Sequence, residues 1–176
     1  GGISDRTIDW QSLTDDFHPD ATSCLADPDD RRVDGTDAVF EVTVPKGGSL
    51  WANLSFPTEQ KFGALYLSRT CGSGTASCLA TSQSDEGDET LTWTNPSDGA
   101  RTLYVVADSL PGISRKGTLN IQVGQPTCTP GDTMCTGDEV QQCNSVGVGY
   151  EPPLSCPAKC GQGACNGEAC AAPIDA

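Results

Sequence analysis

The distribution of cysteine along the chain is the feature that most constrains its fold. The chain has 176 residues and ten cysteines. Three of them, Cys24, Cys71 and Cys78, lie in the first 124 residues, and the other seven lie in the last 52. So high a share of cysteine in a short segment is typical of a disulfide-bonded mini-domain, whereas the longer segment can bury a core of its own. We therefore expect two domains, residues 1–124 and residues 125–176.

Alternation of apolar and polar residues predicts strands in the first domain. Turn-forming residues separate the alternating segments, which recur about every twelve residues, as in an antiparallel sandwich or barrel. The segment 101–108 is apolar on both faces, which favours a central strand. The segments that we expect to form strands are 6–11, 40–44, 50–56, 63–68, 77–82, 90–94, 101–108 and 118–123. The sequence thus predicts an all-β protein, an antiparallel β-sandwich followed by a disulfide-rich mini-domain.

The first domain resembles the bacterial pre-peptidase C-terminal domain over roughly residues 5–124. The residues that carry the resemblance are Asp15-Asp16-Phe17, Asp37-Ala38-Val39-Phe40-Glu41-Val42-Thr43-Val44-Pro45, Phe62-Gly63-Ala64-Leu65-Tyr66-Leu67, the pair Cys71 and Cys78, Glu89-Thr90-Leu91 and Leu103-Tyr104-Val105-Val106-Ala107-Asp108-Ser109. The resemblance implies a jelly-roll-like sandwich, sometimes with calcium, usually attached to a secreted peptidase. No peptidase is present in this sequence. The second domain looks like a small cysteine module that often accompanies such sandwiches.

Disulfides are the expected state of the cysteines, because structural zinc sites favour Cys-x-x-Cys and the sequence contains none. Cys71 and Cys78 flank a flexible loop between two predicted strands, and antiparallel neighbours can bring their α-carbons to the ~5.5 Å of a disulfide. We expect these two to pair. Cys24 is then left over, and we expect it to bond to the second domain, with Cys170 as the first candidate. The spacing leaves open the pairing of Cys128, Cys135, Cys143, Cys156, Cys160 and Cys165.

Calcium is the one cofactor that the sequence permits, because two acidic loops offer the oxygen ligands that it prefers. The alternative is that these acids are solvated turn residues that keep an acidic protein soluble. The candidate ligands are Asp27, Asp29, Asp30, Asp34 and Asp37 in the first loop and Asp85 and Asp88, with Glu86 and Glu89, in the second. The first loop does not follow the EF-hand pattern.

Charge and motifs exclude several classes of function. The net charge of −14 argues against binding to nucleic acid or to an anionic membrane. No apolar run approaches the ~18 residues of a membrane span. The only histidine, His18, lies in a polar loop, and the sequence has neither a G-x-S-x-G nor an H-E-x-x-H motif. We therefore expect no enzyme activity.

Two classes of function remain for a protein with so many disulfides, which we expect to be secreted or on the cell surface. The first is a structural protein, a subunit of an extracellular fibre that self-associates by strand addition or by disulfides. The second is a secreted module that binds carbohydrate or protein, either with or without calcium. Trp51 and Tyr66 fall on the outward phase of their strands and could stack on sugar rings, although packing against the opposite sheet or the second domain is the favoured role. We place assembly first, because the odd cysteine counts are compatible with a crosslinked polymer.

Overall fold

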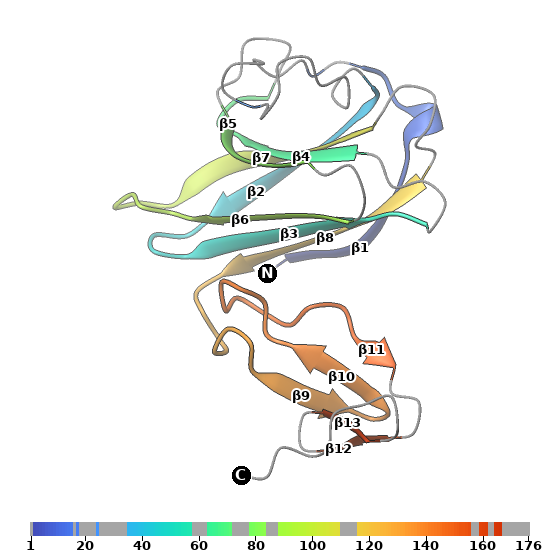
Figure 1. Cartoon of the computed structure of the whole chain (residues 1–176). Coiled ribbons are helices and arrows are strands. Elements are labelled where there is room, and N and C mark those ends of the chain that lie inside the picture. The colour runs from blue at the N-terminus through green and yellow to red at the C-terminus, as the bar shows by residue number, and fades with distance from the viewer. Residues whose placement is uncertain are drawn as a thin grey trace. The chain divides into compact units, whose positions relative to one another are not determined.

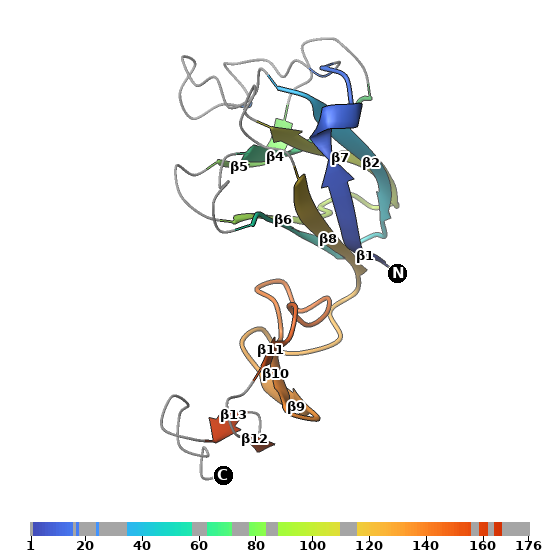
Figure 2. The ribbon, with the colours of Figure 1, turned by 90° about the vertical axis from the view of Figure 1, so that its right-hand side faces the viewer.

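A computed structural model describes residues 2–15, 17, 24, 35–57, 63–71, 78–83, 88–109, 116–155, 159–161 and 164–166. The chain divides into two compact units, Gly1–Gly124 and Gln125–Ala176. This division coincides with the domain boundary that the sequence predicts. Figures 1 and 2 show the strands of both units in two views.

Two four-stranded antiparallel sheets form the first unit (Figure 1). In spatial order, one sheet contains β1 (Gly2–Asp9), β8 (Lys116–Gly124), β3 (Ser49–Ser55) and β6 (Glu89–Thr94). The other contains β2 (Asp37–Val44), β7 (Arg101–Ser109), β4 (Gly63–Ser68) and β5 (Cys78–Gln83). Except for β4 and β5, successive strands alternate between the sheets, which is the strand order of an eight-stranded jelly roll. The predicted all-β antiparallel sandwich is therefore confirmed.

The core lies between the two sheets and is built from alternate residues of each strand. On β3, Leu50, Ala52 and Leu54 are fully buried, as the period-two pattern predicts. Burying a large apolar side chain contributes about 1.5–3 kcal/mol, so these rows hold the sheets face to face. The other main contributors are Leu65 and Leu67 of β4, Leu91 of β6, Leu103 and Val105 of β7, and Leu119 and Ile121 of β8.

A second, smaller apolar cluster covers the outer face of the sheet that contains β7. Ala64, Tyr66 and Val106 point to that face, and Phe17 and Cys24 pack on them. This cover explains why β7 is apolar on both faces. The strand lies between β2 and β4, the central position that the sequence predicts for it.

The edge strand β1 begins earlier than the predicted 6–11 and ends where a short 3-10 helix, η1 (Trp10–Ser12), begins. Trp10 is buried and stacks on Phe56 with ring centroids 5.8 Å apart. Gly117 on β8 makes room for it, since a Cβ there would lie 2.6 Å from the Trp10 ring. The close approach of strand and indole therefore requires glycine at this position.

The second unit is held by short strands and by disulfides. A three-stranded sheet has the order β11 (Leu154–Ser155), β10 (Glu139–Gln142) and β9 (Thr133–Thr136). A two-residue turn joins β9 to β10, with Gly137 at φ +65°. β12 (Lys159–Gly161) pairs with β13 (Ala164–Asn166). A disulfide joins Cys128 to Cys143, in agreement with the predicted disulfide-rich mini-domain.

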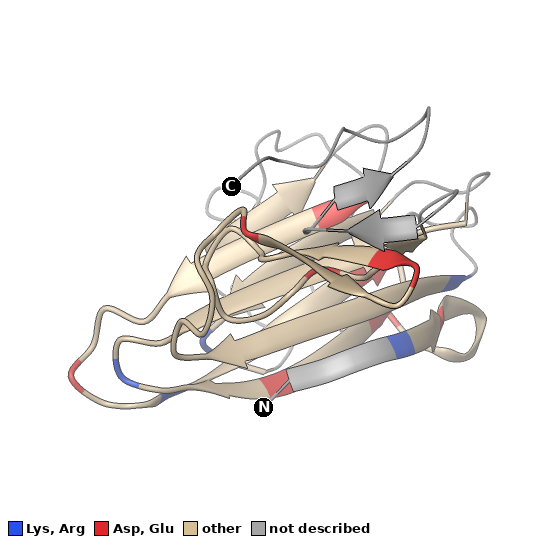
Figure 3. Cartoon of the chain, turned by 90° about the horizontal axis from the view of Figure 1, so that it is seen from below, with Lys and Arg blue, Asp and Glu red and all other residues tan. Residues whose placement is uncertain are grey.

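The described basic residues that Figure 3 colours blue lie apart from one another along the ribbon. Two of them form surface ion pairs: Lys46 with Asp98 at 3.3 Å, and Lys116 with Asp9 at 3.6 Å. Among the described residues, no helix is long and apolar enough to cross a membrane.

Candidate functional site

The disulfide of the sandwich differs from the one that the sequence predicts. Cys24 bonds to Cys78, with α-carbons 5.0 Å apart, and Cys71 is an exposed free thiol. The predicted Cys71–Cys78 and Cys24–Cys170 pairs are therefore wrong. The register explains the difference, because Cys78 lies opposite Ser68 across a strand irregularity and packs against the outer cluster that contains Cys24.

The cysteines of the second unit are only partly within the described residues. Besides Cys128 and Cys143, Cys135 is also in a disulfide. Cys160 and Cys165 lie directly opposite each other on β12 and β13. Cys156 and Cys170 lie outside the described residues.

Most of the predicted calcium ligands, Asp27, Asp29, Asp30, Asp34 and Asp85, together with Glu86, also lie outside the described residues. The two remaining aspartates bind backbone amides. Phe17 donates its N–H to Asp37 Oδ2 at 2.7 Å, and Phe56 donates its N–H to Asp88 Oδ1 at 3.1 Å. Glu89 is buried and accepts a hydrogen bond from the Ser82 hydroxyl at 2.7 Å. Within the described part of the chain, no cluster of three metal-ligating side chains occurs. Calcium binding therefore stays a prediction.

Asp37 and Asp108 form a buried pair of carboxyl groups at the ends of β2 and β7. Burial raises the pKa of Asp108 well above its ordinary value, and the nearby charges of Asp37 and Asp15 raise it further. The Ser109 N–H opposes this rise, but neither Asp108 oxygen has a hydrogen bond of good geometry. A carboxyl group in such surroundings favours its protonated form.

The two aromatic residues that the sequence nominates for ligand binding are not exposed. Trp51 is 2% exposed and Tyr66 is fully buried. Tyr66 stacks on Phe17 with ring centroids 6.5 Å apart, and Gln83 donates to its hydroxyl at 3.4 Å. Of the two roles that the sequence left open, the structure shows packing, and these residues form no exposed sugar-binding surface. The outer cluster covers the outward-facing side chains of β4, so they are buried rather than exposed.

One end of the sandwich carries a pocket that the sequence analysis missed. Three inward-facing rows reach this end, and each finishes in a large polar or aromatic residue rather than an aliphatic one. Leu65 and Leu67 of β4 are followed by Arg69, Leu91 of β6 by Trp93, and Leu103 of β7 is preceded by Arg101. We call this the arginine–tryptophan pocket; it is lined by Arg69, Leu79, Trp93, Asn95, Pro96, Ser97, Arg101, Thr102 and Leu103.

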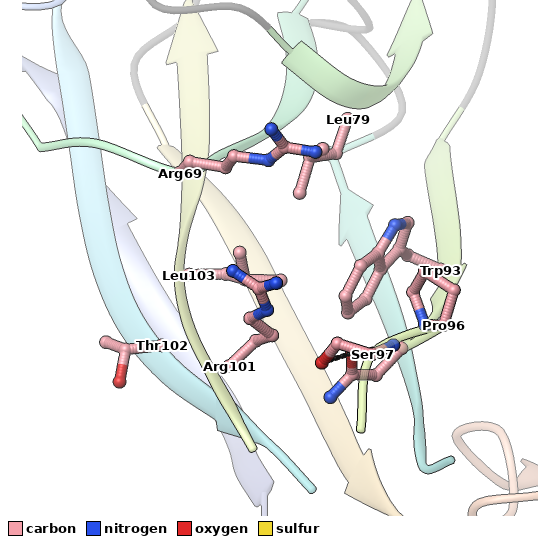
Figure 4. Close-up of a pocket in the computed structure, with 9 residues that line it drawn as sticks. Arg69, Leu79, Trp93, Pro96, Ser97, Arg101, Thr102 and Leu103 are labelled. Atoms are coloured by element: carbon pink, nitrogen blue, oxygen red, sulfur yellow. Dashed lines mark hydrogen bonds between the residues drawn. The ribbon is translucent and has the colours of Figure 1, made fainter. Parts of the chain in front are cut away.

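The pocket combines an apolar wall with two cations (Figure 4). Trp93 packs partly against the core and faces Arg101 and Leu103 across the pocket, while Arg69 lies beside Leu79. The cavity has a volume of about 150 Å³. Neither guanidinium forms an ion pair with a described residue. The indole N–H of Trp93 likewise has no hydrogen bond to any residue that the structure describes.

A hydrogen-bonded loop holds one side of the pocket in place. Asn95 is buried and donates to the carbonyl oxygens of Val44, Pro45 and Gly99 at 2.8–3.0 Å. Its side-chain oxygen accepts from the backbone and the hydroxyl of Ser97, at 3.0 and 2.7 Å. These bonds fix the loop between β6 and β7, so the pocket is pre-organised on this side.

A second cavity is less suited to a charged ligand. It has a volume of about 420 Å³ and is lined by Thr7, Ser55, Phe56, Pro57, Lys116, Gly117 and Thr118. Its one charged lining residue, Lys116, already pairs with Asp9.

Comparison with known proteins gives no match: no family model, no curated protein and no solved structure matches this chain. The geometry of the pocket therefore carries the functional argument.

Proposed function

We propose that this protein is a non-catalytic extracellular binding module that takes a ring-bearing anion in the arginine–tryptophan pocket. The observation that carries the proposal is the placement of two guanidinium groups, Arg69 and Arg101, which form no ion pair with a described residue, around a cavity walled by Trp93. Arginine forms strong charge-assisted hydrogen bonds with carboxylates and related anions. Ligand sites combine such convergent polar groups with an apolar wall.

The extracellular location is supported by the disulfides. Cys24–Cys78 and Cys128–Cys143 join residues of the sandwich and of the second unit, respectively. Such bonds persist in oxidising compartments and are rare in the cytosol.

The absence of catalysis is supported by the chemistry of the pocket. Among the described residues that line it, there is no histidine, cysteine or carboxylate to act as a base or a strong nucleophile. The buried pair Asp37 and Asp108 does not line it. The jelly-roll strand order is also the one that a pre-peptidase C-terminal domain would have, which supports a role as an accessory module.

Fluorescence titration tests this function. Trp10 and Trp51 are buried, so Trp93 is the tryptophan that a ligand in the pocket would affect. Phenylacetate, a sulfated trisaccharide and trigalacturonate serve as anionic probes, with uncharged maltotriose for comparison. At least one anion should change the emission of the native protein. The Arg69→Gln/Arg101→Gln double variant should lose that response, whereas Arg6→Gln, which removes an exposed arginine on β1, should keep it. A full set of anions without effect would exclude the proposal.

Assembly into a fibre, the first expectation from the sequence, stays a prediction. The N-terminal segment that could add a strand to a neighbour is β1, which pairs with β8 of its own chain. β1 is nevertheless an edge strand whose other side pairs with no described strand, so strand addition stays a route beside disulfides. We place the binding module first because the arginine–tryptophan pocket supplies a site for it. Light scattering of the native protein under non-reducing conditions distinguishes monomers from polymers.

A further inference from the structure

The class of ligand can be inferred from the same pocket, and this step rests on the proposed function. We infer that the pocket binds a polysaccharide that contains uronic acid, with one uronate ring on Trp93 and its carboxylate between Arg69 and Arg101. The inference combines the size of the cavity, the geometry of its cations, the polar groups at its edge and the charge of the whole protein.

The size of the cavity fits one six-membered ring. Its volume is about 150 Å³, which equals that of an engineered protein cavity known to bind benzene, about 150 Å³. The indole of Trp93 supplies a flat wall, and Leu79 and Leu103 supply the apolar edges. A pyranose ring presents a flat C–H face that can lie on such a wall.

The cations fit a carboxylate attached directly to that ring. Guanidinium groups match the planar carboxylate with paired N–H···O bonds. Arg101 lies next to Leu103 on the inward row of β7, so its charge is at the edge of the apolar wall. A uronate carries its carboxylate on the ring carbon itself. One monosaccharide can therefore contact Trp93 and the arginines at the same time.

The remaining polar groups favour a sugar over an aromatic acid. The indole N–H of Trp93 has no hydrogen bond to a described residue. The Ser97 hydroxyl donates within its loop and keeps lone pairs that can accept. The hydroxyl groups of a sugar would use both, whereas a benzene ring would cover them without a bond, at an energetic cost.

The negative charge of the whole protein limits how densely charged the bound polymer can be. A chain with a net charge of −14 repels dense polyanions at distances beyond the Debye length, about 8 Å at physiological salt. At shorter distances, the positive charges of Arg69 and Arg101 attract a carboxylate in the pocket. A polymer with one carboxylate or less per sugar meets this limit better than a heavily sulfated glycan or a nucleic acid does.

Binding of short uronates, measured by calorimetry and by Trp93 fluorescence, tests the inference. The probes are trigalacturonate and trimannuronate, and the matched control is methyl-esterified trigalacturonate, which keeps the rings and loses the charges. At least one uronate should bind and should shift the emission of Trp93. Its ester should bind about tenfold more weakly or worse, because the charge-assisted hydrogen bonds are lost.

Single-residue variants test the carboxylate contact of the arginines and the ring contact of Trp93 one at a time. Arg69→Gln and Arg101→Gln should each weaken uronate binding about tenfold, Arg101→Lys should restore only part of it, and Arg6→Gln should have no effect. Trp93→Ala should abolish binding while circular dichroism shows the sandwich intact. If that variant unfolds, Trp93→Phe replaces it, and a reduced affinity of Trp93→Phe for uronate likewise shows that the indole contacts the ligand.

Three outcomes would overturn the inference. If the ester binds as tightly as the acid, or if the arginine variants bind like the native chain, the carboxylate contact is wrong. If both uronates fail while phenylacetate or a sulfated trisaccharide binds in an arginine-dependent way, the uronate class is wrong and the proposed anion-binding function stands. If every anionic probe fails, the inference and the proposed function fall together.

Discussion

Asp37 and Asp108 lie directly opposite each other across β2 and β7, and both side chains are buried. Two ionised carboxylates so close together would repel strongly at the low dielectric of a protein interior. The structure accommodates them because Asp37 accepts the Phe17 N–H at 2.7 Å and the pKa of Asp108 is raised, first by burial and then by Asp37. Asp37 thus holds the backbone of Phe17 at the sheet, and the raised pKa of Asp108 favours its protonated form.

Stability should consequently fall as the pH rises. In the unfolded chain Asp108 loses its proton near pH 4, whereas the folded chain keeps it to a higher pH. The folded state then binds more protons than the unfolded state. Unfolding free energy therefore decreases, by up to about 1.4 kcal/mol per pH unit, from pH 4 until the raised pKa is passed.

The Asp108→Asn variant should lose this decrease. It should melt at a higher temperature than the native protein at pH 7, and the difference should shrink toward pH 4, where both side chains are neutral. Thermal melts followed by circular dichroism at several pH values measure it. Asp98→Asn is the control, because Asp98 is exposed and its surface ion pair with Lys46 contributes little. An Asp108→Asn curve parallel to that of the native protein would contradict the assignment.

The Cys24–Cys78 bond should contribute most of the covalent stabilisation of the sandwich. It closes a loop with a sequence separation of 54, which corresponds to about 4 kcal/mol in the chain-entropy model. The Cys24→Ala/Cys78→Ala double variant should therefore lose several kcal/mol in urea unfolding, and Cys71→Ser should lose very little. Alkylation of the folded protein, followed by peptide mapping, should label Cys71 and spare Cys24 and Cys78. A Cys71–Cys78 peptide in the map would show that the pairing expected from the sequence was right.

The sandwich was predictable because each strand repeats one simple pattern. Leu50, Ala52 and Leu54 alternate with Trp51, Asn53 and Ser55, and burial of the aliphatic row selects the strand and its orientation together. Residues 101–108 are apolar on both faces, which indicated a central strand, and β7 is central. Such signals are local, so one sequence suffices to interpret them.

The disulfide and the pocket depend on contacts between distant segments. Cys24 meets Cys78 because Phe17 and Cys24 pack on the outer face of one sheet, and the periodicity of the strands does not predict this packing. The same packing buries Tyr66. One sequence signal for the pocket does exist: Arg101 on β7, and Arg69 directly after β4, continue the inward-facing rows, where a charged residue is unexpected. Their proximity to Trp93, however, follows from the strand order of two sheets.

Trp93 should be the only tryptophan that solvent reaches. The chain has three tryptophans, and Trp10 and Trp51 are 1% and 2% exposed, whereas Trp93 is half-buried. Acrylamide should therefore quench one component of the emission of the native protein, and Trp93→Phe should remove that component. A quenchable component of undiminished size in Trp93→Phe would show that another tryptophan is exposed. This measurement tests the structure of the pocket without any ligand.

Asn95 should link the stability of the sandwich to the shape of the pocket. Its amide group is buried and donates to three carbonyl oxygens, of Val44, Pro45 and Gly99. Asn95→Ala removes the buried amide that joins these carbonyl groups. The Pro45 and Gly99 carbonyl oxygens keep hydrogen bonds from the Gly48 N–H and the Ser97 hydroxyl, so the main loss is at the buried Val44 carbonyl oxygen, about 1–3 kcal/mol. We expect a loss of this size in urea unfolding and a more quenchable Trp93, because the loop that carries Pro96 and Ser97 loses its anchor. Ser97→Ala is the matched control: it removes only the exposed end of the network and should cost less than 1 kcal/mol. Equal losses for the two variants would mean that Asn95 does not organise this loop.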